Sequence, residues 1–303
     1  MKKTPNDYRG QSKKLEDRNK TKAKAFAKKD AGRKKPGGPK AKTAETQESR
    51  YVDNRQSGPS DKAYKLLAAQ EGISNAKAKE LIDRGLVYVG NKKVMIARGE
   101  LSLKTEFIVH HIEKIRPLFE NDDLVVVDKP AFLNADEVER QFKGTHLLHR
   151  LDRETSGVLM LVKNDAFREQ AIEAFRNDEV YKEYVAWVEG VVTEEAVIDE
   201  PILTEKRQGK AHSKVSKQGK PAVTEITPLE VSGKKSKLKL VIHHGRTHQI
   251  RTHLRFFGHP IIGDEQYGGK PGQRVMLHAK KVKLLGLEFE APEPKLFRHF
   301  SAS

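Results

Sequence analysis

The sequence predicts an α+β protein in which two folded domains follow a disordered basic arm. Three observations support this prediction. Strand-like runs with few helical patterns between them occupy the chain from about residue 115 onwards. Two short helical patterns and a hairpin signal precede them. The first 50 residues hold 17 Lys and Arg against 6 Asp and Glu, whereas the remaining 253 hold 41 against 36. A chain of 303 residues is long enough for about two domains.

Residues 1–59 form the predicted arm. Tyr8 and Phe26 are the only aromatic residues among its first 50 positions, and "AGRKKPGGPKAK" lies at its centre. Such a segment cannot bury enough apolar surface to offset the entropy cost of ordering it. We expect the arm to bind the phosphates of a nucleic acid without reading its sequence. A solubilising tail, or a nuclear import signal, is the alternative.

Composition also bounds the class of protein. The chain has no cysteine, so it has neither disulfides nor thiolate metal sites. No stretch approaches the roughly 18 apolar residues of a membrane span. The N-terminal "MKKTPNDYRGQSKKLEDRNK" lacks the apolar core of a secretory signal. We therefore expect a cytoplasmic, monomeric protein with no membrane partner.

Residues 60–112 predict a small domain of two helices and a hairpin. "SDKAYKLLAAQEG" has helical spacing and ends at Gly72, Ser74 can cap the helix "NAKAKELIDRG", and Gly90-Asn91 joins two short strands. Leu81 and Ile82 are expected to face a small core. This order resembles the small RNA-binding domain named after ribosomal protein S-four, although an unrelated helical linker domain is the alternative. The resemblance implies that basic residues of this domain contact RNA: Lys77, Lys79, Arg84, Lys92 and Lys93.

Residues 113–303 form the second predicted domain. "DLVVVDKP" and "GVLMLVK" are buried-type strands, and a helix with the stripe Phe167, Ala171 and Phe175 follows them. Strand alternation then continues in "VYKEYVAWVEG", "KLKLVIHHG" and the C-terminal "VMLHAKKVKLLGLEFEAP". The few helices indicate a largely antiparallel sheet.

The segment "RTHQIRTHLRFFGHP" breaks the strand alternation and predicts an amphipathic helix. Its apolar stripe is Ile250, Leu254 and Phe257. The opposite, polar face is expected to carry four other residues: His248, Arg251, Thr252 and Arg255.

Asp152 lies in "HRLDRETSG", residues 149–157, between Arg150 and Arg153. A neighbouring Arg favours the ionised carboxylate, which is a poor general base but a usable nucleophile or electrostatic stabiliser. Glu154 points away from Asp152 if the loop is extended, so a glycosidase-like carboxylate pair is not indicated. On local chemistry alone, a structural ion-paired turn is the better interpretation.

Two further groups have alternative interpretations. The four histidines of "HHGRTHQIRTH" have no carboxylate within the segment, which argues against a metal site. Gly245 before a helix start, with Arg246, Arg251 and Arg255, favours a phosphate or carboxylate ligand instead. Tyr184 shares a strand face with Lys182 and is either a core aromatic or a stacking platform for a base.

Taken together and in this order, these stretches resemble the RluA-like pseudouridine synthases over residues 115–300. "HRLDRETSGVLML" is similar to the family's catalytic loop, "VYKEYVAWVEG" to its tyrosine strand, and "GRTHQIRTHL…GHPIIGDEQYGG" to its third motif. "KVSKQGKPAVTEITPLE" is similar to the hairpin between them. One departure is "KPAFLNADEVERQFKG", which lacks the Gly that usually follows Lys-Pro-Ala, and this departure leaves the RNA target open.

The resemblance implies a pseudouridine synthase fold, a mixed and mostly antiparallel sheet with flanking helices and a basic central cleft. It implies an isomerase that needs no cofactor and no metal, with Asp152 as the attacking carboxylate, Arg251 as its ion-pair partner and Tyr184 stacked on the target base. Arg150 would fill the gap left by the flipped uridine. We expect Arg246 and His248 to contact RNA as well.

The expected partner is structured RNA, with ribosomal RNA favoured over transfer RNA because of the S-four-like domain. Two alternative functions remain at this point. One is a non-catalytic RNA-binding or ribosome-assembly factor, and the other is a metal-dependent RNA hydrolase built on the histidines.

Overall fold

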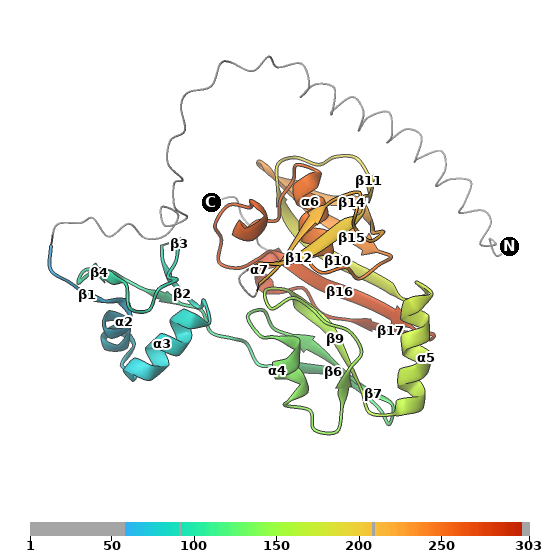
Figure 1. Ribbon diagram of the computed structural model, residues 1–303, viewed down its shortest axis with the longest axis horizontal. Helices are drawn as coiled ribbons and strands as arrows, with labels where there is room; N and C mark the ends of the chain where they lie inside the picture. The colour runs from blue at the N-terminus through green and yellow to red at the C-terminus, as the bar shows by residue number, and fades with distance from the viewer. Residues whose placement is uncertain (1–57, 91, 208–209, 299–303) are drawn as a thin grey trace, which may run out of the picture.

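The computed structural model describes residues 58–90, 92–207 and 210–298. The predicted basic arm, residues 1–59, lies outside the described residues except for its last two positions. Figure 1 shows a small N-terminal region beside a larger region built on a sheet. The predicted domain boundary between residues 112 and 113 stays a prediction. Among the described residues, no helix is long and apolar enough to cross a membrane.

The N-terminal region, residues 60–112, combines two helices with short strands. Helix α2 ends at Gly72, which adopts a left-handed φ of 63°, and the Ser74 side chain caps α3 by accepting from the Lys77 amide at 3.2 Å. Ile82 is buried and Leu81 packs against the core, as expected. The elements are β1 (Ser60–Lys62), α2 (Ala63–Glu71), α3 (Asn75–Asp83), β2 (Val87–Val89), β3 (Lys92–Lys93), β4 (Glu100–Ser102) and β5 (Ile108–Val109).

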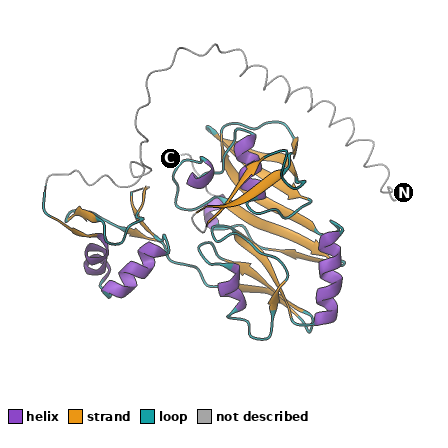
Figure 2. Ribbon diagram, in the orientation of Figure 1, coloured by secondary structure: helices purple, strands orange, loops and turns teal. Residues whose placement is uncertain are grey.

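The second region, called the sheet region below, is built on a ten-stranded sheet (Figure 2). Its main order is β11-β14-β15-β10-β16-β9-β7-β6, with β17 beside β16 and β8 beside β9. Only β16 and β9 pair in parallel among these strands, so the expected mixed, mostly antiparallel sheet is confirmed. The strands are β6 (Arg116–Glu120), β7 (Leu124–Lys129), β8 (His146–Leu147), β9 (Ser156–Val162), β10 (Tyr181–Glu189), β11 (Ala196–Asp199), β14 (Val223–Ser232), β15 (Lys235–Ile242), β16 (Leu277–Leu284) and β17 (Leu287–Glu290).

The remaining elements flank this sheet. The hairpin of β12 (Ile202–Arg207) and β13 (Lys210–Val215) forms a sheet of its own. The helices are α4 (Ala135–Glu139), α5 (Asp165–Arg176), α6 (Gln249–Phe256), α7 (Lys295–Arg298) and the 3₁₀ turn η2 (Glu265–Tyr267). Helix α5 lies along one side of the sheet region in Figure 1, and its Ala171 and Ala174 pack into the core with Met160.

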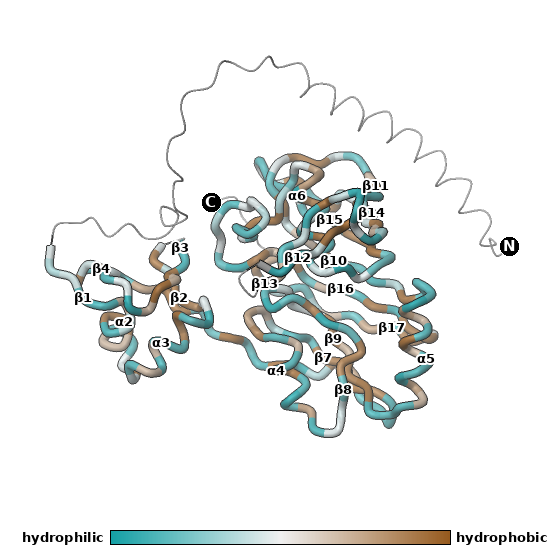
Figure 3. Tube along the Cα trace, in the orientation of Figure 1, coloured by the Kyte–Doolittle hydropathy of each residue, from teal (hydrophilic) through white to brown (hydrophobic). Residues whose placement is uncertain are grey.

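The strand patterns follow from burial. Every residue of β7 and β9 is buried, as their continuous apolar runs predicted, because these strands are covered on both faces. In β15 buried and partly exposed residues alternate along the whole strand. Figure 3 shows the resulting hydrophobic segments in both regions.

Helix α6 departs from the predicted amphipathic pattern. Ile250 and Leu254 are buried as expected, but Arg251 and Thr252 on the predicted polar face are buried too, and Phe257 is partly exposed. The reason is that β13 and η2 pack against the helix and cover its polar face. Arg255 stays exposed.

Candidate active site

Asp152 lies in the loop that leads from β8 into β9. The loop closes at Gly157, whose φ of 114° is left-handed and whose Cβ, if present, would lie 2.1 Å from the carbonyl oxygen of Ala279. Only glycine lets β9 approach β16 this closely. Behind the loop, the buried ammonium of Lys129 donates to the carbonyls of Leu133 at 2.7 Å and Arg153 at 3.4 Å. Burial lowers the pKa of Lys129 to about 7.

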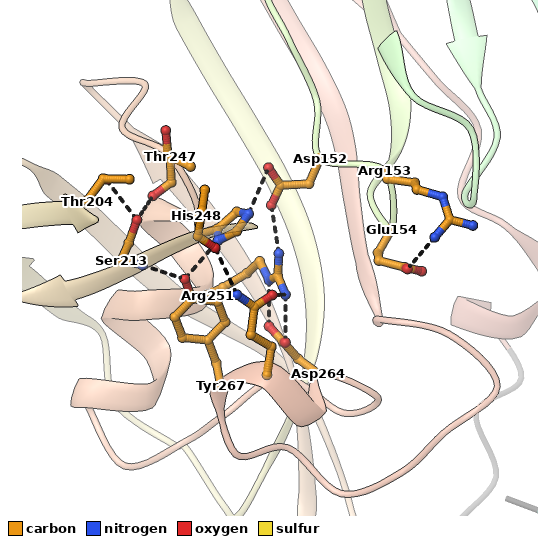
Figure 4. Close-up of polar contacts among 12 residues, drawn as sticks. Asp152, Arg153, Glu154, Thr204, Ser213, Thr247, His248, Arg251, Asp264 and Tyr267 are labelled. Carbon is orange, nitrogen blue, oxygen red and sulfur yellow. Dashed lines mark hydrogen bonds and ion pairs between the residues drawn. The ribbon is translucent and has the colours of Figure 1, made fainter. Parts of the chain in front are cut away.

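The Asp152 carboxylate contacts two side chains from the beginning of helix α6. Arg251 Nη1 donates to Oδ2 at 3.2 Å, and His248 Nε2 lies 3.8 Å from Oδ1 (Figure 4). Asp152 and Arg251 are 99 positions apart in the chain. The Oδ1 atom accepts no hydrogen bond from the described residues, so one carboxylate oxygen remains available to a substrate.

Arg251 is itself held by a second carboxylate. Its Nε and Nη2 donate to the two oxygens of Asp264 at 2.7 and 2.8 Å, and Nη2 also donates to Gln266 at 3.2 Å. Burial opposes the charged form of Arg251, but the hydrogen bonds and charge of Asp264 outweigh it and raise the pKa of Arg251. Arg251 therefore remains a fixed cation beside Asp152. The sequence analysis did not identify Asp264 as a site residue, although Asp264 lies in "GHPIIGDEQYGG", which is similar to the family's third motif.

His248 has a defined orientation. It adopts a left-handed φ of 53° just before α6, so the helix begins at Gln249 rather than directly after Gly245. The Tyr267 hydroxyl accepts from the Ser213 amide at 2.9 Å and lies 2.7 Å from His248 Nδ1. Because burial lowers the pKa of His248, its ring is neutral, and the Tyr267 proton is best donated to Nδ1. The Nε2 proton then faces Asp152. Tyr267 and Ser213 were not singled out from the sequence.

Tyr184 lies on β10, on the same face of the sheet as Lys182. The β10–β15 register pairs Tyr184 with Leu240 and Lys182 with Ile242. Burial, and to a smaller extent the charge of Asp152, raises the pKa of Tyr184, so its phenol stays protonated. Asp152 and Tyr184 line one cavity of about 520 Å³, which also includes Arg150 and Arg246.

The other residues expected to contact RNA fall into two groups. Arg150 lines the cavity but is exposed, and its guanidinium is paired with both oxygens of Asp136 at 2.5 and 3.0 Å. Arg246 lines the same cavity and donates from Nε to the Pro221 carbonyl at 2.9 Å. Lys77 is exposed and paired with Glu80.

In the N-terminal region, Lys79 lies over the Tyr64 ring at 4.3 Å, and Lys92 is exposed. Arg84 and Lys93, which the resemblance assigns to RNA contact, both lie beside carboxylates of the sheet region. Arg84 pairs with Glu137 at 2.9 Å and Lys93 lies 4.0 Å from Glu154. The Arg153 guanidinium also donates to the Arg84 carbonyl, so the loop that carries Asp152 contacts the N-terminal region directly.

The histidines of residues 243–253 point to different partners. His243 pairs with Glu225, His244 accepts from the Val223 amide, and His253 is hydrogen-bonded to Thr224. Across residues 58–90, 92–207 and 210–298, no group of three or more His, Cys, Asp or Glu side chains is arranged to hold a metal ion.

Comparison with known proteins defines the class of this chain as an RNA-modifying isomerase. The family model "RNA pseudouridylate synthase" matches residues 123–256. An "Uncharacterized RNA pseudouridine synthase" of Helicobacter pylori strain J99 is 52% identical over 240 residues, covering 78% of this chain and 99% of the relative. The solved structure of "Human RNA Pseudouridylate Synthase Domain Containing 1" is 30% identical with a TM-score of 0.53, covering 61% of this chain and 86% of that one.

A third relative, "Ribosomal large subunit pseudouridine synthase D" of Haemophilus ducreyi, is 30% identical over 256 residues, covering 70% of this chain and 78% of the relative. The chain belongs to the RluA-type RNA pseudouridine synthase family. It is an RNA pseudouridine synthase, an isomerase, as the motifs predicted.

Proposed function

We propose that the cavity around Asp152 converts a specific uridine of structured RNA to pseudouridine, with Asp152 as the attacking carboxylate. The observation that carries this proposal is the position of Asp152 at the cavity wall, with Oδ2 bound to Arg251 at 3.2 Å and Oδ1 without a hydrogen bond from the described residues. A carboxylate fixed by one oxygen keeps the other oriented toward the substrate.

The reaction is balanced within the substrate. The bond between N1 of uracil and C1′ of ribose breaks, the base rotates, and a bond forms between C5 and C1′. C5 loses a proton and N1 gains one, so no oxidant, reductant or second substrate is consumed. Asp152 would form or stabilise the covalent intermediate between these steps. Arg251 places a fixed positive charge beside the Asp152 carboxylate and holds its Oδ2 atom by a hydrogen bond of 3.2 Å.

Tyr184 and Arg150 are assigned to the flipped nucleotide. The Tyr184 ring lines the cavity beside Asp152, where it can stack on the target uracil. Arg150 stands at the exposed end of the same loop, where it can fill the gap in the RNA stack. Its ion pair with Asp136 is exposed, and such pairs contribute only about 0–1 kcal/mol, so RNA can displace it.

The remaining RNA contacts are proposed for the residues that the sequence analysis assigned to RNA. Arg246 and His248 line the cavities around Asp152. The N-terminal region is proposed to be the S-four-like RNA-binding domain, with Lys77, Lys79 and Lys92 directed to RNA, and Arg84 and Lys93 available only in part. Ribosomal RNA is favoured over transfer RNA, a preference supported by the similarity to large-subunit synthases.

The test combines mapping with variants. Carbodiimide-based pseudouridine mapping of all stable RNAs, with and without this protein, identifies the target uridine. Asp152→Asn and Asp152→Ala should abolish conversion at that position while RNA binding survives. Asp136→Asn, which removes an exposed carboxylate nearby, is the matched control and should convert normally. Unchanged modification in the Asp152 variants would instead support the non-catalytic assembly factor.

The basic arm has its own test. Deleting residues 1–50 removes 17 Lys and Arg. We expect RNA affinity to fall, with a shallower dependence on salt concentration, while the single-turnover rate stays nearly unchanged. Equal affinity of the full chain and the deletion at low salt would exclude the arm as an RNA contact.

A further inference from the structure

The active-site cavity extends beyond Asp152 and Tyr184. Its volume is about 520 Å³, and cavities of about 300–1,000 Å³ hold ligands larger than a single base. The extension lies on the same face of the sheet as Tyr184. It is lined by His149, Met160, Phe175, Lys182, Ile242 and Val282, with Arg246 at its side.

Lys182 is an incompletely paired cation in this extension. It is 7% exposed, and its only hydrogen bond to the described residues runs from Nζ to the His243 carbonyl at 3.2 Å. The Phe175 ring centroid lies 5.6 Å away, and no ion pair with a described carboxylate exists. An ammonium group has three donors, and a buried one is normally paired or fully hydrogen-bonded. Lys182 therefore retains unused donors at the cavity wall.

Arg246 adds a second positive charge to the same cavity. Among the described residues its guanidinium donates only from Nε, to the Pro221 carbonyl, so both terminal amino groups are free to bind a ligand. Burial lowers the pKa of Lys182, the charge of Asp178 partly opposes this effect, and the charge of Arg246 lowers the pKa further. An anion between the two cations would remove this repulsion and replace the lost hydration.

We infer that Lys182 and Arg246 form a phosphate-binding subsite, which holds a backbone phosphate adjoining the target uridine. The inference rests on the proposed function, because Asp152 and Tyr184 must receive the uridine. Lys182 and Tyr184 are two positions apart on one strand face, so their Cα atoms lie about 7 Å apart and both side chains line the same cavity. The planar guanidinium of Arg can donate two hydrogen bonds to one phosphate, and the ammonium of Lys contributes a compact positive charge. Both are common phosphate ligands.

His149 and Phe175 also line this extension and carry no charge. His149 and Phe175 lie with ring centroids 6.0 Å apart, and burial lowers the pKa of His149 to about 4, so the imidazole is neutral. His149 Nε2 accepts from the Met160 amide at 3.2 Å and is thereby occupied. The other residues of this extension, Met160, Ile242 and Val282, are apolar, so its charged donors are Lys182 and Arg246. Arg150 lines the same cavity, but its guanidinium is paired with Asp136.

The test uses the full chain and an RNA fragment that carries the mapped uridine. The fragment is made with normal linkages, or with one neutral methylphosphonate on the 5′ or the 3′ side of that uridine. The protein variants are Lys182→Met and Lys182→Arg. The matched control is Lys239→Met, because Lys239 pairs with Val185 and therefore lies on the opposite face of the sheet from Lys182.

We expect one of the two methylphosphonates to raise KM about 10-fold for the unaltered protein, as for a charged hydrogen bond. Lys182→Met should raise KM for the normal fragment by a similar factor, with kcat nearly unchanged and no further loss on that methylphosphonate. Lys182→Arg should recover most of the affinity. Lys239→Met should match the unaltered protein on all fragments.

The subsite would be overturned if the increase in KM from Lys182→Met added to the increase from each of the two methylphosphonates. It would also be overturned if Lys182→Met changed only kcat. If Lys182→Met does not fold, Arg246→Gln replaces it in the same comparison with the two methylphosphonates. Additive increases in KM for Arg246→Gln would overturn the subsite as well. Failure of the proposed function has a different signature. In that case the unaltered protein would convert no uridine, or Asp152→Ala would convert it equally well.

Discussion

Asp264 is predicted to hold Arg251, the proposed partner of Asp152, in place, and Asp264→Asn tests this role. Asp264 is 1% exposed and Arg251 is 5% exposed, and two hydrogen bonds of 2.7 and 2.8 Å join them. The substitution keeps the size of the side chain but removes its charge. Arg251 then keeps Asp152 as its only carboxylate partner among the described residues.

The expected cost can be estimated from this geometry. Removing one partner of a buried ion pair costs about 3–5 kcal/mol, because the other charge stays buried. We expect the lower end, about 3 kcal/mol, because Gln266 and Asp152 still contact Arg251. For a region of this size each kcal/mol lowers Tm by about 2–4 °C, so the expected fall is roughly 6–12 °C.

Thermal unfolding followed by circular dichroism measures this effect. The control is Asp136→Asn, which breaks an Arg–Asp pair of similar hydrogen-bond length at the exposed Arg150 and should cost at most about 1 kcal/mol. Conversion of the mapped uridine should also fall in Asp264→Asn, since Arg251 no longer positions Asp152 firmly. Equal and small shifts of Tm in the two variants would refute the reasoning.

Three further predictions concern stacking, backbone and acid stability. Tyr184→Leu should lose about 1–3 kcal/mol of base stacking in conversion assays while Tyr184→Phe retains most of it, and equal losses would exclude stacking. Gly157→Ala should lower Tm far more than Gly144→Ala, because only the Gly157 Cβ would clash with a backbone, 2.1 Å from Ala279; similar values would contradict this. Burial lowers the pKa of His278 to about 3, so its stabilising effect is complete above pH 6.5 and is lost as pH falls toward 3. His278→Gln should therefore flatten the decline of unfolding free energy over this interval, and an unchanged slope would disprove it.

The sheet could be predicted from the sequence because strand patterning is local. The continuous apolar runs of β7 and β9 and the alternation of β15 each report whether one or both faces of a strand are covered. The catalytic role proposed for Asp152 has a different basis. Its local surroundings favour a structural turn, and the proposal depends on the order of three motifs along the chain.

Helix α6 shows where such reasoning fails. The helical period correctly placed Ile250 and Leu254 inward, but it could not show that β13 and η2 cover the other face and bury Arg251. A polar side chain looks the same in the sequence whether it faces water or a buried carboxylate. For the same reason Asp264 was not recognised as the partner of Arg251.

The sequence by itself indicated the family, through the order of three motifs along the chain, and the strands, through the periodicity of apolar residues at neighbouring positions. It also supplied the residue types available for the chemistry. Only the tertiary structure decided which of these residues meet. It brought Asp152 to Arg251 across 99 positions, placed Arg84 against Glu137, and left Lys182 with unused donors in the cavity. These contacts depend on which loops the sheet order brings to one edge, and hydrophobic periodicity carries no information about that order.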